Sequence, residues 1–326
     1  MKKTIEQLIA GEHLNKTEAK EQLLRLSTEQ LPQEQLAGFL VAIQAKGLQL
    51  DELQGFQEAL LEMCLPIDFG TQHYIDVCGT GGDGKDTFNI STTTAFVLAS
   101  MGYPVVKHGN YGVSSLCGSS NVLEYLGLTF SADTETLKRQ LDEHQLVFLH
   151  APLFHPALKK MAPIRKSLGI PTFFNELGPL VNPARPHFQL TGTYRLGLAR
   201  FYQHILAQHR EAFYVLHGLN GYDELTFDGA TRVFGKNEDL VLQSAPNQTK
   251  IQTQQFTGGD IATSARILVD VLSGKGNDSQ NTIIAGNVAL GIRCFEPATS
   301  FESAFQTAYE HLLAGTSIQL LNAMQS

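Results

Sequence analysis

The sequence has few cysteines, no tryptophan, a deficit of positive charge and no long apolar run. Its 326 residues include four scattered cysteines, without the spacing of metal ligands or of a disulfide framework. Lysine and arginine total 24 against 32 acidic residues, which argues against a general binder of nucleic acids or anionic membranes. The start of the chain lacks an apolar leader pattern, and no later run could span a membrane, so we expect a cytoplasmic protein.

The length suffices for one large or two modest domains. Apolar residues recur at helical spacing in residues 1–70, and the stretch 66–70 ends that pattern. We therefore predict a helical domain at 1–70, joined by part of 165–190. The prolines of 178–186 suit an ordered crossing between domains. Residues 71–326 alternate short β-branched runs with helical patterns, which predicts an α/β domain.

Individual elements follow from the same patterns. Strands are expected at 74–77, 105–106, 147–149, 189–193 and 212–218. Helices are expected from Ser91 onward and at 121–126, 157–168, 198–206 and 260–272, with two final helices at 281–294 and 301–313.

A glycine-rich loop follows the first of these strands. It runs from Gly79 to Gly84, with four glycines in six residues, and leads into Asn89-Ile90-Ser91-Thr92 at the start of a helix. Glycine lets backbone N–H groups approach a ligand, and a helix start adds unpaired N–H groups. The loop therefore predicts a phosphate or pyrophosphate site. Asp83 within it would repel phosphate unless a cation or a hydroxyl-bearing ligand lies between them.

A second polar loop follows Val105-Val106, about 25 residues further on. It starts with Lys107 and His108. Its polar side chains include Asn110, Ser114, Ser115 and Ser119. The spacing predicts a βαβ unit with both loops at the same edge of a parallel sheet. Neither loop has the spacing of a Walker A motif or of a dinucleotide-binding fingerprint.

The motifs of both loops, with others further along, resemble those of anthranilate phosphoribosyltransferases. The matching stretches are Gly79-Thr80-Gly81-Gly82-Asp83, Asn89-Ile90-Ser91-Thr92, Lys107-His108-Gly109-Asn110, Gly118-Ser119-Ser120-Asn121-Val122-Leu123-Glu124, His155-Pro156-Ala157, Pro163-Ile164-Arg165, Asn175-Glu176-Leu177-Gly178-Pro179-Leu180-Val181-Asn182-Pro183 and Gly221-Tyr222-Asp223-Glu224. The resemblance covers nearly the whole chain. It implies a mostly parallel central sheet flanked by helices, of the nucleoside phosphorylase and phosphoribosyltransferase type. It also implies transfer of the 5-phosphoribosyl group from phosphoribosyl pyrophosphate to the amine of anthranilate, with release of pyrophosphate, in tryptophan biosynthesis.

The resemblance implies a role for individual residues. Phosphoribosyl pyrophosphate is expected at Gly79, Gly81, Gly82, Asp83, Thr87, Asn89, Ser91, Thr92, Lys107 and Ser119. Anthranilate is expected at Gly79, Asn110, His155 and Arg165, where the planar fork of the arginine suits a carboxylate. Ser91, Asp223 and Glu224 are expected to hold Mg²⁺, two ions per subunit, because hard cations take oxygen ligands. Catalysis is then positioning and metal chemistry without a single catalytic residue, in a homodimer formed through the helical domain.

Two residues depart from the family pattern. Tyr111 stands where the family usually has arginine, and Asn121 where it often has aspartate.

Two other functions stay open. A pyrimidine nucleoside phosphorylase-like enzyme would use inorganic phosphate without Mg²⁺, and the pair Asp223-Glu224 argues against it. A non-catalytic nucleic-acid-binding relative would be basic, whereas this chain has a formal net charge of −8.

Overall fold

The computed structural model describes residues 1–112 and 117–325, so Ser114 and Ser115 lie outside the described residues. The chain divides into two compact units, and each is formed by two separate segments. The first combines Met1–Ile67 with Ala151–Pro183, and the second combines Asp68–His150 with Ala184–Ser326. In the part of the chain that the structure describes, no helix is long and apolar enough to cross a membrane.

The first unit is helical. Its elements are α1 (Lys2–Ile9), α2 (Lys16–Thr28), α3 (Gln33–Lys46), α4 (Leu50–Met63), α8 (Ala151–Phe154), α9 (Pro156–Leu168) and the short 3₁₀ helices η1 (Phe173–Glu176) and η2 (Gly178–Leu180). Gly55 lets α4 approach α2, because a Cβ atom there would lie 2.3 Å from the carbonyl oxygen of Lys16. Phe173 of η1 stacks on Phe56 of α4 at a centroid distance of 4.4 Å and meets Phe39 of α3 edge-on. The later segment thus completes a core that the N-terminal helices begin.

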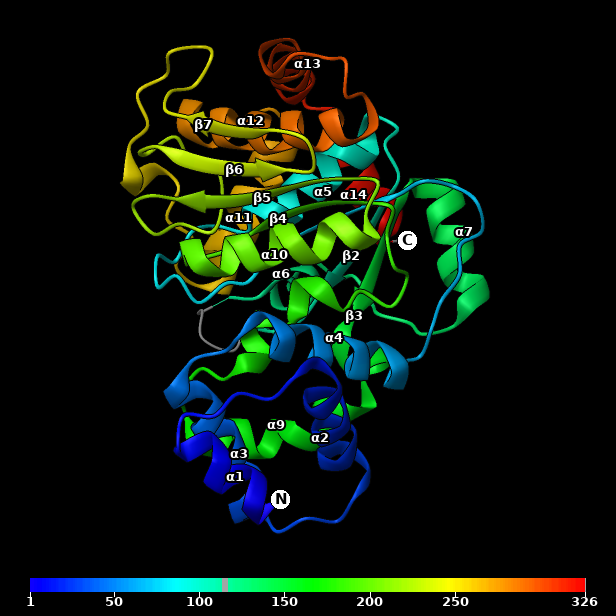
Figure 1. Ribbon diagram of the computed structural model, residues 1–326. Coiled ribbons are helices and arrows are strands. Elements are labelled where there is room, and N and C mark those ends of the chain that lie inside the picture. Colours follow the sequence, from blue (N-terminus) through cyan, green and yellow to red (C-terminus); the bar gives the residue numbers. More distant parts are fainter. Residues whose placement is uncertain (113–116, 326) are drawn as a thin grey trace. The chain divides into compact units, whose positions relative to one another are not determined.

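The second unit is built on one seven-stranded sheet with the order β3-β2-β1-β4-β5-β6-β7 (Figure 1). The strands are β1 (Ile75–Gly79), β2 (Val105–Gly109), β3 (Leu146–His150), β4 (Phe188–Gly192), β5 (Ala212–Gly218), β6 (Thr231–Gly235) and β7 (Asp239–Leu242). The strands β1 to β5 pair parallel with one another, and β6 pairs antiparallel with both β5 and β7. The predicted α/β fold with a mostly parallel sheet is therefore confirmed.

Helices flank this sheet. They are α5 (Ile90–Ser100), α6 (Ser119–Tyr125), α7 (Thr134–His144), α10 (Leu196–His209), η3 (Thr253–Gln255), α11 (Ile261–Leu272), α12 (Asp278–Phe295), α13 (Phe301–Ala314) and α14 (Ile318–Met324). From the middle of the sheet, the crossover β1-α5-β2 steps one way and β4-α10-β5 steps the other way. Because such crossovers are right-handed, α5 and α10 cover opposite faces. The order of the strands reverses between β1 and β4, and ligands of open α/β sheets bind at such a point.

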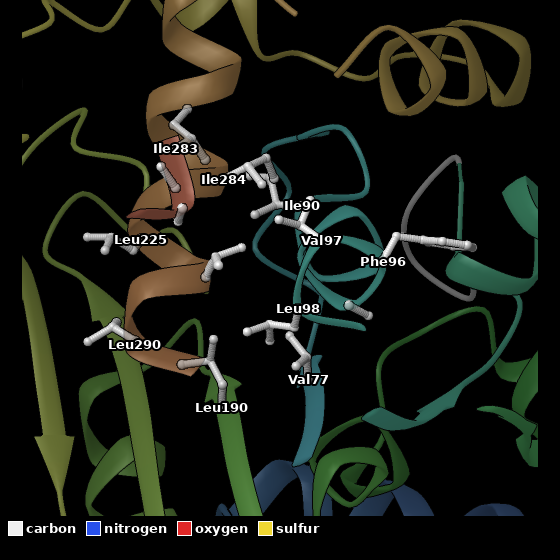
Figure 2. Close-up of a cluster of buried hydrophobic side chains, with 14 of the residues drawn as sticks. Val77, Ile90, Phe96, Val97, Leu98, Leu190, Leu225, Ile283, Ile284 and Leu290 are labelled. Atoms are coloured by element: carbon white, nitrogen blue, oxygen red, sulfur yellow. The ribbon is translucent and has the colours of Figure 1, made fainter. Parts of the chain in front are cut away.

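The main core of this unit lies between the sheet and the helices α5 and α12 (Figure 2). Figure 2 shows Ile284 of α12 pointing toward Ile90 and Val97 of α5. Gly291 brings these helices close, because a Cβ atom there would lie 2.7 Å from Leu98 Cδ1. The start of α5, which carries predicted site residues, is therefore fixed by a helix from the C-terminal part of the chain.

The last helix was not predicted. The sequence patterns end with helices at 281–294 and 301–313, but the structure adds α14, of seven residues. A helix of seven residues covers about two turns and offers too few positions to show a periodic pattern. Its one buried residue is Leu321.

Candidate active site

The predicted site residues of the second unit gather where β1 and β4 end. Gly79 closes β1, Gly192 closes β4, and the two glycines are register partners. Asp223 occupies the space above them. A Cβ atom on Gly79 would lie 2.6 Å from Asp223 Oδ2, and one on Gly192 would lie 1.3 Å from the carbonyl oxygen of Asp223. Both strands must therefore end in glycine for Asp223 to reach this position.

The two carboxylates of the Asp223-Glu224 pair are held by the glycine loop and the start of α5. The backbone N–H of Gly81 donates to Asp223 Oδ2 at 2.7 Å. The backbone N–H of Ser91 donates to Glu224 Oε1 at 3.1 Å, and the hydroxyl of Thr87 donates to Glu224 Oε2 at 3.4 Å. The N–H of Ser91 lies at the helix start that the sequence pattern predicts for a phosphate, but it binds a carboxylate of the chain itself.

The glycine loop has a backbone conformation that other residues avoid. Gly81, Gly82 and Gly84 have φ values of +59°, +78° and +68°. The loop is anchored at its far end, where Thr87 pairs with Thr257 in an isolated β-bridge. Glycine reaches such positive φ values without steric cost, so the loop can bring backbone N–H groups close to an anion, although the N–H of Gly81 is already bound to Asp223.

Asp83 joins the same group of carboxylates. Its Oδ1 accepts from the N–H of Lys85 at 3.1 Å, and its Oδ2 is buried. Burial, followed by the charge of Asp83, raises the pKa of Asp223 to about 7. Burial, followed by the charges of Asp223 and Asp83, raises the pKa of Glu224 well above its ordinary value. Three carboxylates therefore lie close enough to repel one another.

Lys107 is the buried cation beside this group. Its ammonium donates to the carbonyl oxygen of Val77 and, at 3.2 Å, to the hydroxyl of Ser91. Burial lowers the pKa of Lys107, and nearby negative groups, including Glu224, act in the opposite direction. One ammonium does not balance three carboxylates. An oxygen-rich group with surplus negative charge fits Mg²⁺, a hard cation that takes carboxylate and hydroxyl oxygens.

The remaining residues predicted for phosphoribosyl pyrophosphate lie around α5 and α6. Asn89 is the N-cap of α5, and its Oδ1 accepts from the thiol of Cys117. Thr92 lies in the first turn of α5 and is buried. Ser119 begins α6, and its hydroxyl donates to the carbonyl oxygen of Asn110 at 3.4 Å.

The two departures from the family pattern have partners within the second unit. The hydroxyl of Tyr111 donates to Glu124 at 2.6 Å. Asn121 Oδ1 accepts from the N–H groups of Gly112 at 2.9 Å and Gly118 at 3.0 Å. An asparagine side chain thus ties together the two ends of the second loop.

Of the residues predicted for anthranilate, Gly79 and Asn110 belong to the second unit and His155 and Arg165 to the first. His155 is buried, and its Nε2 donates to the carbonyl oxygen of Val181 at 2.9 Å. Burial lowers the pKa of His155 to about 4, so its ring is neutral at pH 7. The guanidinium of Arg165 donates to Asn175 Oδ1 at 3.1 Å. Their role toward anthranilate stays a prediction.

Sequence reasoning missed two features of this site. Gly192 carries no local signal, because one glycine at the end of an apolar run is common. Asp83 was assigned to phosphoribosyl pyrophosphate and not to the metal ligands, whereas the structure also places it beside Asp223. The signal was an acidic residue inside an anion-binding loop, which calls for a cation.

Comparisons with known proteins agree with this geometry. Residues 71–318 match the model of the glycosyl transferase family, a/b domain, and residues 2–64 match that of its helical bundle domain. An anthranilate phosphoribosyltransferase of Christiangramia forsetii is 42% identical over 100% of this chain and 98% of its own length. One of Cytophaga hutchinsonii is 44% identical over 97% of both chains.

The chain belongs to the anthranilate phosphoribosyltransferase family. Solved structures of this family share its fold. The enzyme of Thermus thermophilus superimposes with a TM-score of 0.89 at 30% identity, covering 98% of both chains. The enzyme of Saccharomyces cerevisiae, in complex with phosphoribosyl pyrophosphate and Mg, superimposes with a TM-score of 0.88 at 26% identity, covering 98% of this chain and 95% of the yeast chain.

Proposed function

We propose that this enzyme transfers the 5-phosphoribosyl group from phosphoribosyl pyrophosphate to the amine of anthranilate in a Mg²⁺-dependent reaction. The observation that carries the proposal is the group of Asp83, Asp223 and Glu224 beside Lys107 and the glycine loop. Further support comes from the yeast relative, which has been solved with phosphoribosyl pyrophosphate and Mg and also with 4-fluoroanthranilate.

Asp83, Asp223, Glu224 and the hydroxyl of Ser91 would hold the metal, and we propose two Mg²⁺ ions per subunit. Bound Mg²⁺ supplies positive charge where negative charge builds on the departing pyrophosphate. The clustered carboxylates repel one another without a cation, which favours binding of the metal.

The chain contributes mainly by positioning. The loop N–H groups, such as that of Gly82, donate to the pyrophosphate, and the ammonium of Lys107 adds positive charge beside Ser91. An aromatic amine is neutral at pH 7 and needs no strong base. Holding the two substrates in line can supply roughly 7–11 kcal/mol of the rate enhancement.

We propose that Arg165 binds the carboxylate of anthranilate. Charge-assisted hydrogen bonds contribute about 1.5–3 kcal/mol, so Arg165→Ala is expected to raise the KM for anthranilate by about 10-fold to 100-fold. The KM for phosphoribosyl pyrophosphate is expected to stay unchanged. Lys166→Ala, at the exposed neighbouring position, is the matched control. Equal increases in both KM values would contradict this assignment.

The deciding experiment follows anthranilate consumption with and without phosphoribosyl pyrophosphate and Mg²⁺. Loss of anthranilate only when both are present supports the proposal. Phosphorolysis of thymidine or uridine by inorganic phosphate would favour the phosphorylase-like alternative. Absence of turnover together with salt-dependent binding of single-stranded DNA would favour the nucleic-acid-binding alternative.

We also propose that the enzyme is a homodimer formed through its helical unit. Exposed apolar side chains of that unit include Ile9 and Val41. Light scattering is expected to give twice the mass of one chain, and a Val41→Glu variant is expected to shift the protein toward the monomer. A monomeric mass for the unmodified protein at all concentrations would contradict this proposal.

A further inference from the structure

Three side chains of metal-binding type lie at the amino-terminal edge of the sheet, opposite to the edge that carries the glycine loop. His73 lies just before β1, His187 just before β4 and Glu211 just before β5. These strands are neighbours, and backbone hydrogen bonds continue their register beyond the strands, for example from the N–H of Glu211 to the carbonyl oxygen of His187 at 2.9 Å. Parallel pairing therefore gathers residues that are up to 138 positions apart.

The distances suit a metal ion. One ligand atom from each residue can be chosen so that all three lie within 4.8 Å of one another. His73 Nε2 and Glu211 Oε1 are 3.2 Å apart. Tetrahedral Zn²⁺ with bonds of about 2.0–2.2 Å places its ligand atoms about 3.3–3.5 Å apart. The side chains of His73 and Glu211 are 49% and 59% exposed, so they are free to rotate over the remaining distance.

The surroundings hold the two imidazole rings near each other. The ring centroids of His73 and His187 lie 4.5 Å apart. Tyr74 packs edge-on against His187, and Phe188 stacks on His73. Burial lowers the pKa of His187, which favours the neutral imidazole that binds metals.

A simpler reading is a hydrogen-bonded surface pair of His73 and Glu211 with a second ring stacked beside it. That reading leaves one observation unexplained, since the Nδ1 atom of His187 is buried and has no hydrogen-bond partner among the described residues. The positive charge of Arg210 lies nearby and would oppose the binding of a cation. Its guanidinium donates through Nε to Gln189 at 3.0 Å, and this residue is buried.

We propose that His73, His187 and Glu211 form a second metal site, which binds one Zn²⁺ per chain. Two imidazoles and one carboxylate are a donor set that zinc uses, whereas Mg²⁺ takes oxygen ligands. A bound ion would connect the starts of β1, β4 and β5. It would therefore stabilise the folded sheet without taking part in the transfer reaction.

The test is a calorimetric titration of the metal-stripped full chain with Zn²⁺ in the presence of excess Mg²⁺, which competes for the carboxylates of the active site. The variants are His73→Ala, His187→Ala and Glu211→Gln. His204→Ala removes an exposed histidine of α10 outside this group and is the matched control. Circular dichroism without metal checks that each variant is folded. The half-exposed Glu211→Gln keeps the side-chain shape, so it serves if a histidine variant fails to fold.

The expected result is one Zn²⁺ per chain for the unmodified protein and for His204→Ala, with a higher melting temperature when Zn²⁺ is bound. Each folded variant of the three ligands is expected to bind Zn²⁺ about 10-fold more weakly or worse, since loss of even an outer partner of a metal ligand costs 10-fold to 100-fold. Equal binding by the unmodified protein and the variants overturns the proposal. Loss of Zn²⁺ binding in Asp223→Asn but not in Glu211→Gln also overturns it.

Discussion

Gly79 and Gly192 have no side chains, and Asp223 occupies the space that their Cβ atoms would fill. The position of one acidic residue thus depends on two glycines that end neighbouring strands. Burial raises the pKa values of Asp83, Asp223 and Glu224, and charge repulsion from neighbouring carboxylates adds to this effect at Asp223 and Glu224. Single residues therefore determine where a cation can bind and how much its site destabilises the metal-free protein.

Adding one methyl group at these glycines should have distinct effects. In Gly79→Ala the new Cβ meets the carboxylate of Asp223, so the Mg²⁺ concentration for half activity is expected to rise about 10-fold or more. In Gly192→Ala it meets the backbone of Asp223, and the free energy of unfolding is expected to fall by about 1–3 kcal/mol. Gly197→Ala, where nothing lies within 4 Å, is the control in urea denaturation. Equal stability of the Gly192 and Gly197 variants would contradict this account.

Removing the charge of Asp223 should stabilise the metal-free protein at high pH. The pKa of Asp223 is about 7 in the folded protein against an ordinary value of 3.8, so the folded state binds more protons between these values. The free energy of unfolding therefore falls as the pH rises through this window. Asp223→Asn is expected to have a higher melting temperature than the unmodified protein at pH 8. The difference in the free energy of unfolding is expected to be on the order of a few kcal/mol and to disappear near pH 4.

Mg²⁺ separates this effect from general repacking. It should raise the melting temperature of the unmodified protein at pH 8 and leave that of Asp223→Asn nearly unchanged. If Asp223→Asn were less stable than the unmodified protein by the same amount at pH 8 and pH 4, the surroundings of Asp223 would not disfavour its charged form.

At the scale of elements, the helix α5 connects the core to the site. Its first residues contact Glu224 and Lys107, and its C-terminal part packs on α12 at Gly291. The position of the start of α5 therefore depends on how well α5 packs against α12. The same helix therefore serves stability through one part and ligand binding through the other.

Leu98→Ala tests the contribution of this packing. Leu98 is fully buried, and its removal leaves a cavity between α5 and α12, so the free energy of unfolding is expected to fall by about 2–5 kcal/mol. Leu313→Ala, at a residue that is 54% exposed, is expected to change it by less than about 0.5 kcal/mol. Urea denaturation measures both. A small effect at Leu98 would mean that the two helices close the cavity by moving together.

At the scale of the whole molecule, the chain leaves the helical unit after Ile67, returns to it at Ala151 and leaves again after Pro183. Phe173 of the returning segment packs on Phe39 and Phe56 of the first segment. Neither segment holds the complete core of this unit.

A fragment of residues 1–67 is therefore expected not to fold stably by itself. It lacks α9 and Phe173, and it would expose Phe39 and Phe56, which are fully buried in the complete chain. Circular dichroism should show a loss of helix without a cooperative thermal transition. In the full chain, Phe173→Ala is expected to lower the free energy of unfolding by about 3–5 kcal/mol. A fragment that melts cooperatively would contradict the need for the returning segment.

The sequence by itself determined the family, the fold class and the transferase activity, because glycine loops, helix starts and acidic pairs occur as contiguous motifs. The same local signals could not reveal α14, Gly192 beside Asp223, or the meeting of His73, His187 and Glu211. α14 is too short to show a helical pattern, whereas the other two depend on which strands become neighbours and in which register. Only the tertiary structure decided them, because parallel pairing brings together residues that are more than a hundred positions apart in the chain.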